Sequence, residues 1–206
     1  MITYYGGPLA RPRQVSDEEI YEAVREAVQE HGPQVSTTEI AARAGLSQAA
    51  LFKRFGNKET LMVRGLTPPP SPALFKMMSD GPDPARPLAE QLVELARALQ
   101  QRMRETMPRL TALRAAGYTP EQIFQHFDVP PPVLAIRAVE RWVEVGKGHG
   151  MVADGVNGRA FASALLGSVF FHSHMESVAG EWLGSADPEA HIAEVVSMLC
   201  AGIEVS

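Results

Sequence analysis

The chain is 206 residues long, 45% hydrophobic and 21% charged, with a formal net charge of −5. This is the composition of a globular protein, and it excludes a collagen-like or globally disordered chain. The single cysteine, Cys200, cannot form an intramolecular disulfide, and no Cys/His group has zinc-finger spacing, so we expect a reducing, cytoplasmic compartment and neither a metal nor another cofactor. The longest strongly apolar run, residues 161–171, is shorter than the roughly 20 residues that cross a bilayer, so we expect no membrane partner.

Residues 1–15 carry Arg11 and Arg13 among prolines and glycines and lack the continuous apolar core of a signal peptide. We interpret them as a flexible N-terminal arm. The two arginines leave two alternatives open, because such an arm either enters a minor groove of DNA or is simply disordered.

Capping residues and apolar spacing predict short helices between residues 16 and 66. The first helix carries apolar residues at intervals of three and four and begins at a capping box formed by Ser16 and Glu19. A second capping box, Ser36 with Glu39, opens the next helix. Glycines end the helices, which we place at residues 16–31, 36–44, 47–55 and 58–66.

Residues 37–55 predict a helix-turn-helix, in which two helices pack across a tight turn. Ala41 is small where the helices cross, and Gly45 can adopt the positive φ that the turn needs. The inward positions are Ile40, Ala41, Ala44, Leu46, Leu51 and Phe55. Such motifs touch base edges with the N-terminal half of their second helix. In this helix the outward side chains are Ser47, Gln48, Ala49, Phe52 and Lys53.

The outward side chains of the second helix suit contacts with DNA bases. The Gln48 amide can pair bidentately with adenine, and Ala49 can meet a thymine methyl group. Phe52 offers an apolar contact to sugars or methyl groups. We therefore expect this helix to enter a major groove.

The same segment also offers groups that bind phosphate. Thr37 and Thr38 lie at the start of one helix and Lys58 at the start of another, where exposed amides and a partial positive charge favour anions. Residues 36–66 contain five basic and two acidic residues, a balance of +3. A DNA backbone responds to this local charge, although the chain is acidic as a whole.

The run TTEIAARAGLSQAALFKRFGNKETLM resembles the N-terminal domain of the tetracycline-repressor (TetR) family. The resemblance covers residues 16–66, and it extends to the remainder only through length and helical pattern. It implies a homodimeric repressor that binds a palindromic double-stranded DNA operator and is released by a small-molecule effector. Two features depart from the family's pattern: Lys53 and Arg54 replace aromatic or small polar residues, and prolines interrupt a helix that often continues into the second domain.

Residues 67–72 mark a domain boundary, because four of these six residues are prolines, which lack the amide donor of a helix. Beyond it, helical patterns between glycine and proline breaks lie at about 85–105, 108–116, 120–127, 132–146, 157–179 and 187–204. No alternating strand pattern is present. We therefore expect an all-α fold, with a three-helix helix-turn-helix DNA-binding domain at residues 16–66 and a helical ligand-binding and dimerisation domain at residues 73–206.

The last two predicted helices carry apolar stripes that suggest a dimer interface. Two such helices pairing with a symmetry mate form a four-helix interface, and a two-fold dimer matches a palindromic operator. The alternative is that both helices close the core of a single chain. The predicted interface residues are Phe161, Leu165, Val169, Ile192, Val195, Val196, Leu199 and Ile203.

An effector pocket in the second domain would be apolar with a few polar groups. Apolar and aromatic residues of the middle helices are candidates for its lining, although core packing explains them equally well. The candidates are Met103, Met107, Leu110, Tyr118, Phe124, Phe127, Trp142, Phe170 and His174.

Three classes of function remain open: a ligand-controlled repressor, a DNA-binding regulator without an inducer, and a small-molecule enzyme with incidental N-terminal helices. No catalytic constellation is identifiable, so we expect no enzymatic activity. His172 and His174, two residues apart on a helix, point about 200° apart and do not chelate one metal. The GKGHG run, residues 146–150, lacks the spacing of a phosphate-binding loop.

Overall fold

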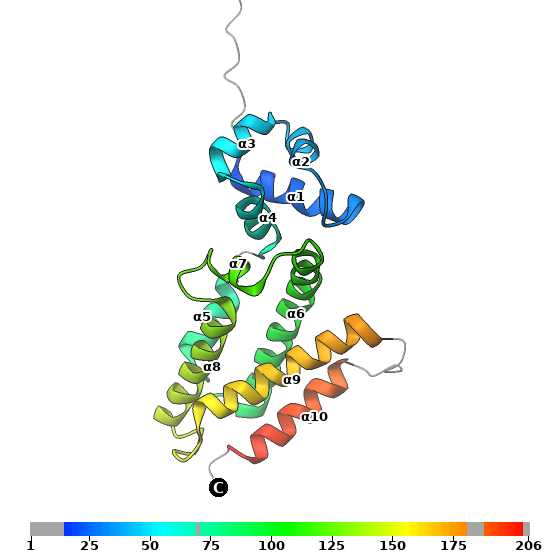
Figure 1. Cartoon of the computed structure of the whole chain (residues 1–206). Coiled ribbons are helices and arrows are strands. Elements are labelled where there is room, and N and C mark those ends of the chain that lie inside the picture. The colour runs from blue at the N-terminus through cyan, green and yellow to red at the C-terminus, as the bar shows by residue number, and fades with distance from the viewer. Residues whose placement is uncertain (1–14, 69–70, 181–187, 204–206) are drawn as a thin grey trace, which may run out of the picture. The chain divides into compact units, whose positions relative to one another are not determined.

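The computed structural model describes residues 15–68, 71–180 and 188–203. Within these ranges it consists of helices and loops without a β-strand, so the expected all-α class is confirmed. The chain divides into two compact units, Met1–Leu66 and Thr67–Ser206. In Figure 1 the first unit is blue to teal and the second runs on to red. The predicted arm lies outside the described residues, apart from Val15.

The first unit consists of α1 (Asp17–His31), α2 (Thr37–Arg43), α3 (Gln48–Phe55) and α4 (Lys58–Leu66). Polar side chains start these helices by accepting a hydrogen bond from a backbone amide three residues further on. Ser16, Ser36 and Ser47 do so at 3.1 to 3.2 Å, and Asn57 does so at 2.7 Å. Each such cap contributes about 1 kcal/mol to the helix that it starts. Short helices are thus fixed at their beginnings by local sequence.

Apolar side chains from all four helices fill the core of the first unit. Ile20, Val24, Ile40, Leu51 and Leu61 are among those that are at most 2% exposed. Burying a side chain of this size stabilises a fold by about 1.5 to 3 kcal/mol. The helix-turn-helix is therefore held on α1 and α4 as a small three-dimensional domain.

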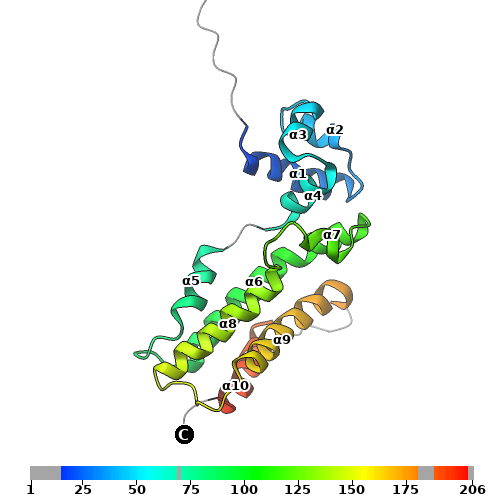
Figure 2. The ribbon, with the colours of Figure 1, turned by 60° about the vertical axis from the view of Figure 1, so that its left-hand side comes forward.

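The second unit consists of α5 (Pro72–Asp80), α6 (Leu88–Ala115), α7 (Pro120–Phe124), α8 (Pro131–Gly148), α9 (Gly158–Ala179) and α10 (Pro188–Ala201). Helix α9 packs against α6 and α8, while α10 packs against α6 and α9. Figure 2 shows α5, the pair α6 and α8, and the pair α9 and α10 following one another across the unit. The centre of its core is formed by Leu92, Leu95, Trp142, Val143 and Leu165.

Two helix predictions in the second unit are wrong: one helix was missed, and two predicted helices form a single one. Helix α5 was not expected, but Ser71 caps it and Pro72 occupies its first turn, where a proline needs no hydrogen-bonded amide. Helix α6 continues through Pro108, where two helices were expected. An internal proline costs a helix about 3 kcal/mol. Packing of α6 on α9 and α10 outweighs that cost, since tertiary contacts supply most helical stability.

None of the helices in the described part of the chain is both long enough and apolar enough to span a membrane.

Candidate functional site

The outward face of α3 is the strongest candidate for a functional surface in the first unit. Gly45 adopts a positive φ of 68°, and the Leu46 amide donates to the Ala41 carbonyl at 2.8 Å, so the turn reverses the chain tightly. Leu51 and Phe55 are buried on the inner side. The five residues predicted to face bases, Ser47, Gln48, Ala49, Phe52 and Lys53, are all exposed. Their side chains are accessible to a ligand as large as DNA.

Two of the predicted phosphate contacts occupy different positions at the start of α2. Thr38 is exposed. Thr37 is only 8% exposed, and its hydroxyl oxygen accepts a hydrogen bond from the Gln48 side-chain amide at 2.7 Å. Thr37 thus lies behind Gln48, and its side chain contributes to the inside of the helix-turn-helix.

Two arginines included in the predicted charge of +3 are paired within the first unit. Arg43 contacts Glu26 at 3.4 Å and also pairs with Glu30, and it holds the pKa of the Glu30 carboxyl below its usual range. Arg54 pairs with Asp17 at 2.5 Å. A charge count along residues 36–66 misses these pairs, because all three carboxylates belong to α1. The basic charge that faces away from α1 is smaller than predicted.

Lys53, on the outward face of α3, and Lys58 have no carboxylate partner within the described ranges. Lys58 is the first residue of α4, directly after the cap Asn57. Exposed amides and the helix dipole favour an anion at such an end. Lys58 therefore remains suited to the predicted phosphate contact.

Tyr21 supports α3 from behind and was not singled out in the sequence. Its ring lies 5.7 Å from that of Phe55, the last residue of α3. Burial raises the pKa of the Tyr21 phenol, as does the nearby Asp17, while Arg64 acts in the opposite direction. Only the packing of α1 on α3 reveals this role, because Tyr21 lies beside the apolar stripe of α1.

The residues predicted to line an effector pocket are dispersed through the second unit. Trp142 is buried in the core and stacks on Phe161 with ring centroids 6.4 Å apart. Phe170 and His174 stack on each other at 5.9 Å and are exposed. Met107 is buried, and the half-buried candidates are Met103, Leu110, Tyr118, Phe124 and Phe127. These residues do not surround one described cavity.

Three buried polar residues, Gln100 on α6 and His172 and Ser173 on α9, were missed by sequence reasoning, and we call them the buried polar cluster. The three residues are 3%, 7% and 4% exposed. Burial, and then the neighbouring His191, lower the pKa of His172, which stacks on His191 at 4.2 Å. The His172 Nε2 and the Ser173 hydroxyl have no hydrogen-bond partner in the described part of the chain. Unpaired buried polar atoms cost about 1 to 3 kcal/mol each, so a hydrogen-bond partner for them would stabilise the unit.

An ion pair joins the two helices that carry these polar residues. Arg104 on α6 and Glu176 on α9 contact at 3.1 Å, one helical turn beyond Gln100 and His172 respectively. In Figure 1 α6 stands nearly upright and α9 crosses it obliquely. The Arg104 guanidinium lowers the pKa of His172 and the Glu176 carboxylate raises it, so both charges act on this imidazole.

Most residues predicted to form the dimer interface lie inside the second unit instead. Phe161, Leu165, Val169, Ile192, Val196 and Ile203 are buried in its core, while Val195 and Leu199 are half-buried. They pack against α6 and α8 of the same chain, which was the alternative left open by the sequence. Helices that are apolar on most sides do not indicate from sequence alone which side faces the core.

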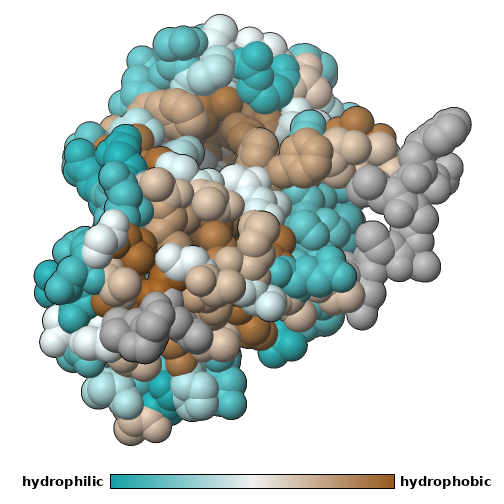
Figure 3. Space-filling model, turned by 90° about the horizontal axis from the view of Figure 1, so that it is seen from below, coloured by the Kyte–Doolittle hydropathy of each residue, from teal (hydrophilic) through white to brown (hydrophobic). Residues whose placement is uncertain are grey.

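Other apolar residues of α9 and α10 are exposed. Phe171 and Val178 on α9 are 64% and 68% exposed, and Met198 on α10 is 68% exposed. Small exposed residues accompany them, namely Ala160, Ala164 and Gly167 on α9 and Ala193 and Ser197 on α10. We call these eight residues the outer face. Figure 3 shows apolar side chains across the middle of the molecule as seen from below, with hydrophilic side chains at the edges.

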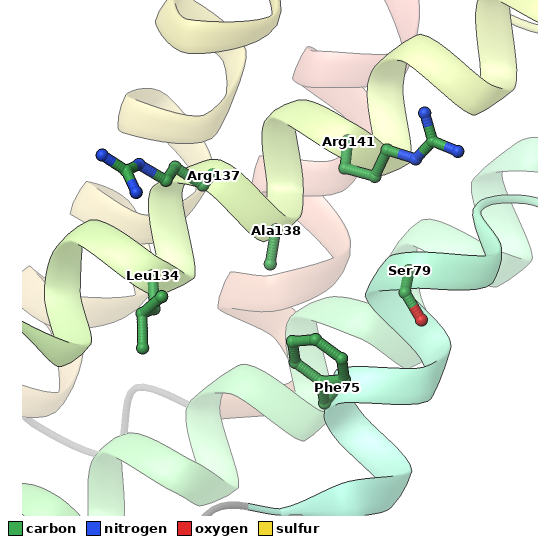
Figure 4. A pocket seen from close by; sticks show the side chains of 6 residues that line it. All are labelled: Phe75, Ser79, Leu134, Arg137, Ala138 and Arg141. Carbon is green, nitrogen blue, oxygen red and sulfur yellow. The ribbon is translucent and has the colours of Figure 1, made fainter. Parts of the chain in front are cut away.

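A shallow groove of about 220 Å³ lies between α5 and α8. Phe75 and Leu134 form apolar walls, and Arg137 and Arg141 stand beside them. Figure 4 shows that the two guanidinium groups point away from each other. They do not converge on a single ligand, so the groove lacks the geometry of an anion-binding site.

Comparison with known proteins gives a family for the first unit. Residues 20–64 match the model of the TetR N-terminal domain, described as "Bacterial regulatory proteins, tetR family". The matched segment contains the whole helix-turn-helix and most of α1 and α4. None of the curated proteins matches the chain.

Known structures resemble nearly the whole chain. A protein from Mesorhizobium loti assigned to the TetR-family transcriptional regulators is 21% identical, covering 92% of this chain and 96% of its own, with a TM-score of 0.72. SmeT, the repressor of the Stenotrophomonas maltophilia multidrug efflux pump SmeDEF, is 20% identical over 94% and 92%, with a TM-score of 0.65. NalD, the secondary repressor of the Pseudomonas aeruginosa pump MexAB-OprM, is 20% identical over 91% and 95%, with a TM-score of 0.62.

At these identities the structures show a shared fold, and the match over residues 20–64 adds the identity of the DNA-binding domain. The exposed face of α3 and the buried inner face behind it agree with that match. Residues 20–64 are therefore a DNA-binding domain of the TetR family, and the chain shares the fold of transcriptional regulators of that family.

Proposed function

We propose that this regulator is a cytoplasmic, homodimeric repressor that binds a palindromic operator through α3 and leaves it when a small molecule binds to the second unit. The observation that carries the proposal is the exposed N-terminal half of α3, where Gln48, Ala49 and Phe52 face outward above a buried inner side. A major groove admits a helix of this kind, and its first residues then meet base edges.

Phosphate contacts set the position of α3 in the groove. Lys53 and Lys58 supply charge without a carboxylate partner in the described ranges, and Thr38 adds a hydroxyl at the start of α2. Arg43 and Arg54 are engaged with carboxylates of α1, so they strengthen the domain and contribute little charge to DNA. We therefore assign the backbone contacts to Lys53, Lys58 and Thr38.

Selection of bound sequences from random DNA by the full-length protein tests the proposal. A homodimer should enrich two inverted half-sites whose centres are about 34 to 36 Å apart, or a multiple of that distance. Enrichment of a single unrepeated site would contradict the two-fold arrangement. Failure to enrich any sequence would contradict specific DNA binding.

The outer face of α9 and α10 is the surface that we assign to dimerisation. Its small residues allow a partner helix to approach closely, and Phe171, Val178 and Met198 supply exposed apolar area for burial. A two-fold axis brings the same patch of both copies together. This assignment replaces the buried residues that the sequence suggested.

Phe171→Glu should separate the dimer without unfolding the chain, because a carboxylate at an apolar interface loses its hydration. Light scattering should give half the mass of the wild type, with an unchanged helical circular dichroism spectrum. Phe75→Glu is a matched control, since Phe75 on α5 is 63% exposed and lies away from the outer face. If the Phe171→Glu variant remains a dimer and the Phe75→Glu variant is a monomer, the dimer interface lies at α5.

The effector is proposed to bind in the second unit at the buried polar cluster of Gln100, His172 and Ser173. Unpaired polar atoms in an apolar interior favour a small molecule that presents hydrogen-bonding groups on an apolar body. One of the similar structures is described as a SmeT–triclosan complex, which is 20% identical over 94% of this chain and 93% of its own, with a TM-score of 0.68. A protein with a similar fold thus forms a complex with a small molecule.

A thermal-shift panel of small molecules that includes triclosan tests this site. A compound that raises the melting temperature should also weaken operator binding, and Ser173→Ala should reduce both effects. Ser163→Ala is the matched control, because Ser163 is exposed on the same helix. Compounds that stabilise the protein yet leave its operator affinity unchanged would favour a regulator without an inducer.

A further inference from the structure

We infer that Thr37 is a positioning residue that fixes the Gln48 amide so that α3 reads adenine in preference to guanine. The inference rests on the proposed DNA-binding function of α3. It concerns how one base reader is oriented, which the family match over residues 20–64 does not specify.

The geometry of the pair places Thr37 behind the reading surface. Thr37 is 8% exposed, whereas Gln48 is exposed at the first turn of α3. The Gln48 Nε2 donates to the Thr37 hydroxyl oxygen at 2.7 Å. Ser36 and Ser47 cap the two helices directly before these residues, so the backbones at both ends of the hydrogen bond are fixed. A side chain that is otherwise free at a helix start is thereby held in one orientation.

The remaining groups of the amide determine which base it can recognise. A glutamine amide has one carbonyl oxygen and two N–H donors. The hydrogen bond to Thr37 uses one N–H, which leaves the oxygen and the second N–H for DNA. The major-groove edge of adenine offers an N6 donor beside an N7 acceptor, and this pattern complements the remaining pair. The edge of guanine offers two acceptors, N7 and O6, and would require two donors.

The hydroxyl of Thr37 therefore matters for specificity more than for affinity. Without it the amide can turn over by about 180° and present its NH2 group where the oxygen had been. In that orientation it donates to guanine O6 or thymine O4. Thr37→Val keeps the shape of the side chain and removes the hydrogen-bond acceptor. Thr37→Ser keeps the acceptor and removes a methyl group.

The test is sequence selection followed by affinity measurements with full-length wild type, Thr37→Val, Thr37→Ser and Gln48→Ala. The wild type should require adenine at one position of each half-site, and Gln48→Ala should lose that requirement. At the same position, Thr37→Val should reduce a discrimination of about tenfold or more to less than about threefold. Thr37→Ser should restore it. In the Gln48→Ala background, Thr37→Val should have no further effect.

Two controls separate positioning from a structural or phosphate-binding role. The melting temperature of Thr37→Val and its preference at the other operator positions should match the wild type. Its affinity should also keep the salt dependence of the wild type, because no phosphate contact is removed. An equal loss of affinity for all sequences with a shallower salt slope would instead make Thr37 a phosphate contact.

The remaining outcomes are decisive as well. A Gln48-dependent preference for guanine or thymine in the wild type would overturn the inference, since it requires the opposite orientation of the amide. So would an adenine preference that Thr37→Val leaves intact. If the wild type selects no sequence, the proposed function fails and the inference fails with it. If an operator is found and only the Thr37 effect is missing, the proposed function holds and the inference about Thr37 fails.

Discussion

The recognition helix α3 and the long helix α9 differ in how apolar residues are distributed around them. In α3, Leu51 and Phe55 are buried on one side, while the exposed side carries polar residues together with Ala49 and Phe52. In α9, Leu165 is buried but Phe171, on the other side of the helix, is 64% exposed. A helix with one apolar stripe has only one good way to pack. For a helix that is apolar on most sides, the helices packed against it determine which side is buried.

The two helices also differ in which residues determine their structure: neighbours in the sequence for α3, and other helices for α9. The start of α3 depends on Ser47 and its turn on Gly45, both within a few residues of the helix. The inner side of α9 depends on its packing against other helices, α6 and α8. Substitutions on the inner and outer sides of the two helices can test this contrast.

The largest effect is expected for Leu165→Ala, at the centre of the second unit. Removing this fully buried side chain should cost about 2 to 5 kcal/mol of unfolding free energy, because part of the cavity remains unfilled. Urea denaturation of the full chain measures it. Thr111→Ala, at an exposed position on α6, should change the free energy by less than about 0.5 kcal/mol. If Leu165→Ala is stably folded but monomeric, Leu165 lies in the dimer interface instead.

Gln48→Ala and Lys58→Ala should affect DNA binding without a comparable loss of stability. Gln48→Ala should cost about 1 to 3 kcal/mol of operator binding and relax one base position. Lys58→Ala should weaken binding to all sequences and lower the salt slope by about one, because one phosphate contact is lost. Titration of operator and random DNA at several salt concentrations distinguishes the two. Unchanged affinity in both variants would contradict the assignment of α3 and α4 as the DNA interface.

Sequence patterns predicted the first unit well because its signals are local. The helix starts at Ser16 and Ser36 and the turn at Gly45 were predicted correctly, although only Ser16 forms the full capping box. The outward side of α3 followed from its single apolar stripe. The pairing of Thr37 with Gln48 was not predictable, since it joins the starts of two helices. Neither was the neutralisation of Arg43 and Arg54 by α1, because a charge count does not include contacts in space.

In the second unit the helical class was predicted correctly, but several buried and exposed surfaces were assigned wrongly. Pro108 indicated a helix break, yet packing carries α6 through it. Phe161 suggested an interface but stacks on Trp142 in the core. The polar cluster around His172 was hidden in an apolar run, because burial on α6 is a tertiary property. Apolar periodicity therefore predicted the helices of this unit but not which side of each helix faces the core.

Ser47→Ala should have a smaller effect, about 0.5 to 2 kcal/mol of stability in the first unit. The Ser47 hydroxyl accepts the Ala50 amide at 3.1 Å, so it caps α3 although it is also exposed on the outward face. Thermal unfolding followed by circular dichroism gives the loss, and Ser47→Asp should recover most of it. If Ser47→Ala changes operator preference at unchanged stability, its main role is to contact a base.

The smallest effect is a dependence of stability on pH in the second unit. Burial and the neighbouring His191 lower the pKa of His172, with Arg104 acting in the same direction and Glu176 opposing it. The unfolded chain, with a histidine pKa of about 6.5, therefore takes up a proton before the folded chain does. The stability that neutral His172 provides is complete above that pH and is lost as the pH falls toward the lower pKa of the folded state. Urea denaturation at pH 7.5 and at successively lower pH should show a decline that His172→Gln makes shallower. An equal decline in both proteins would assign the pH dependence to other groups, and the burial of a neutral imidazole against His191 would then contribute nothing measurable to folding.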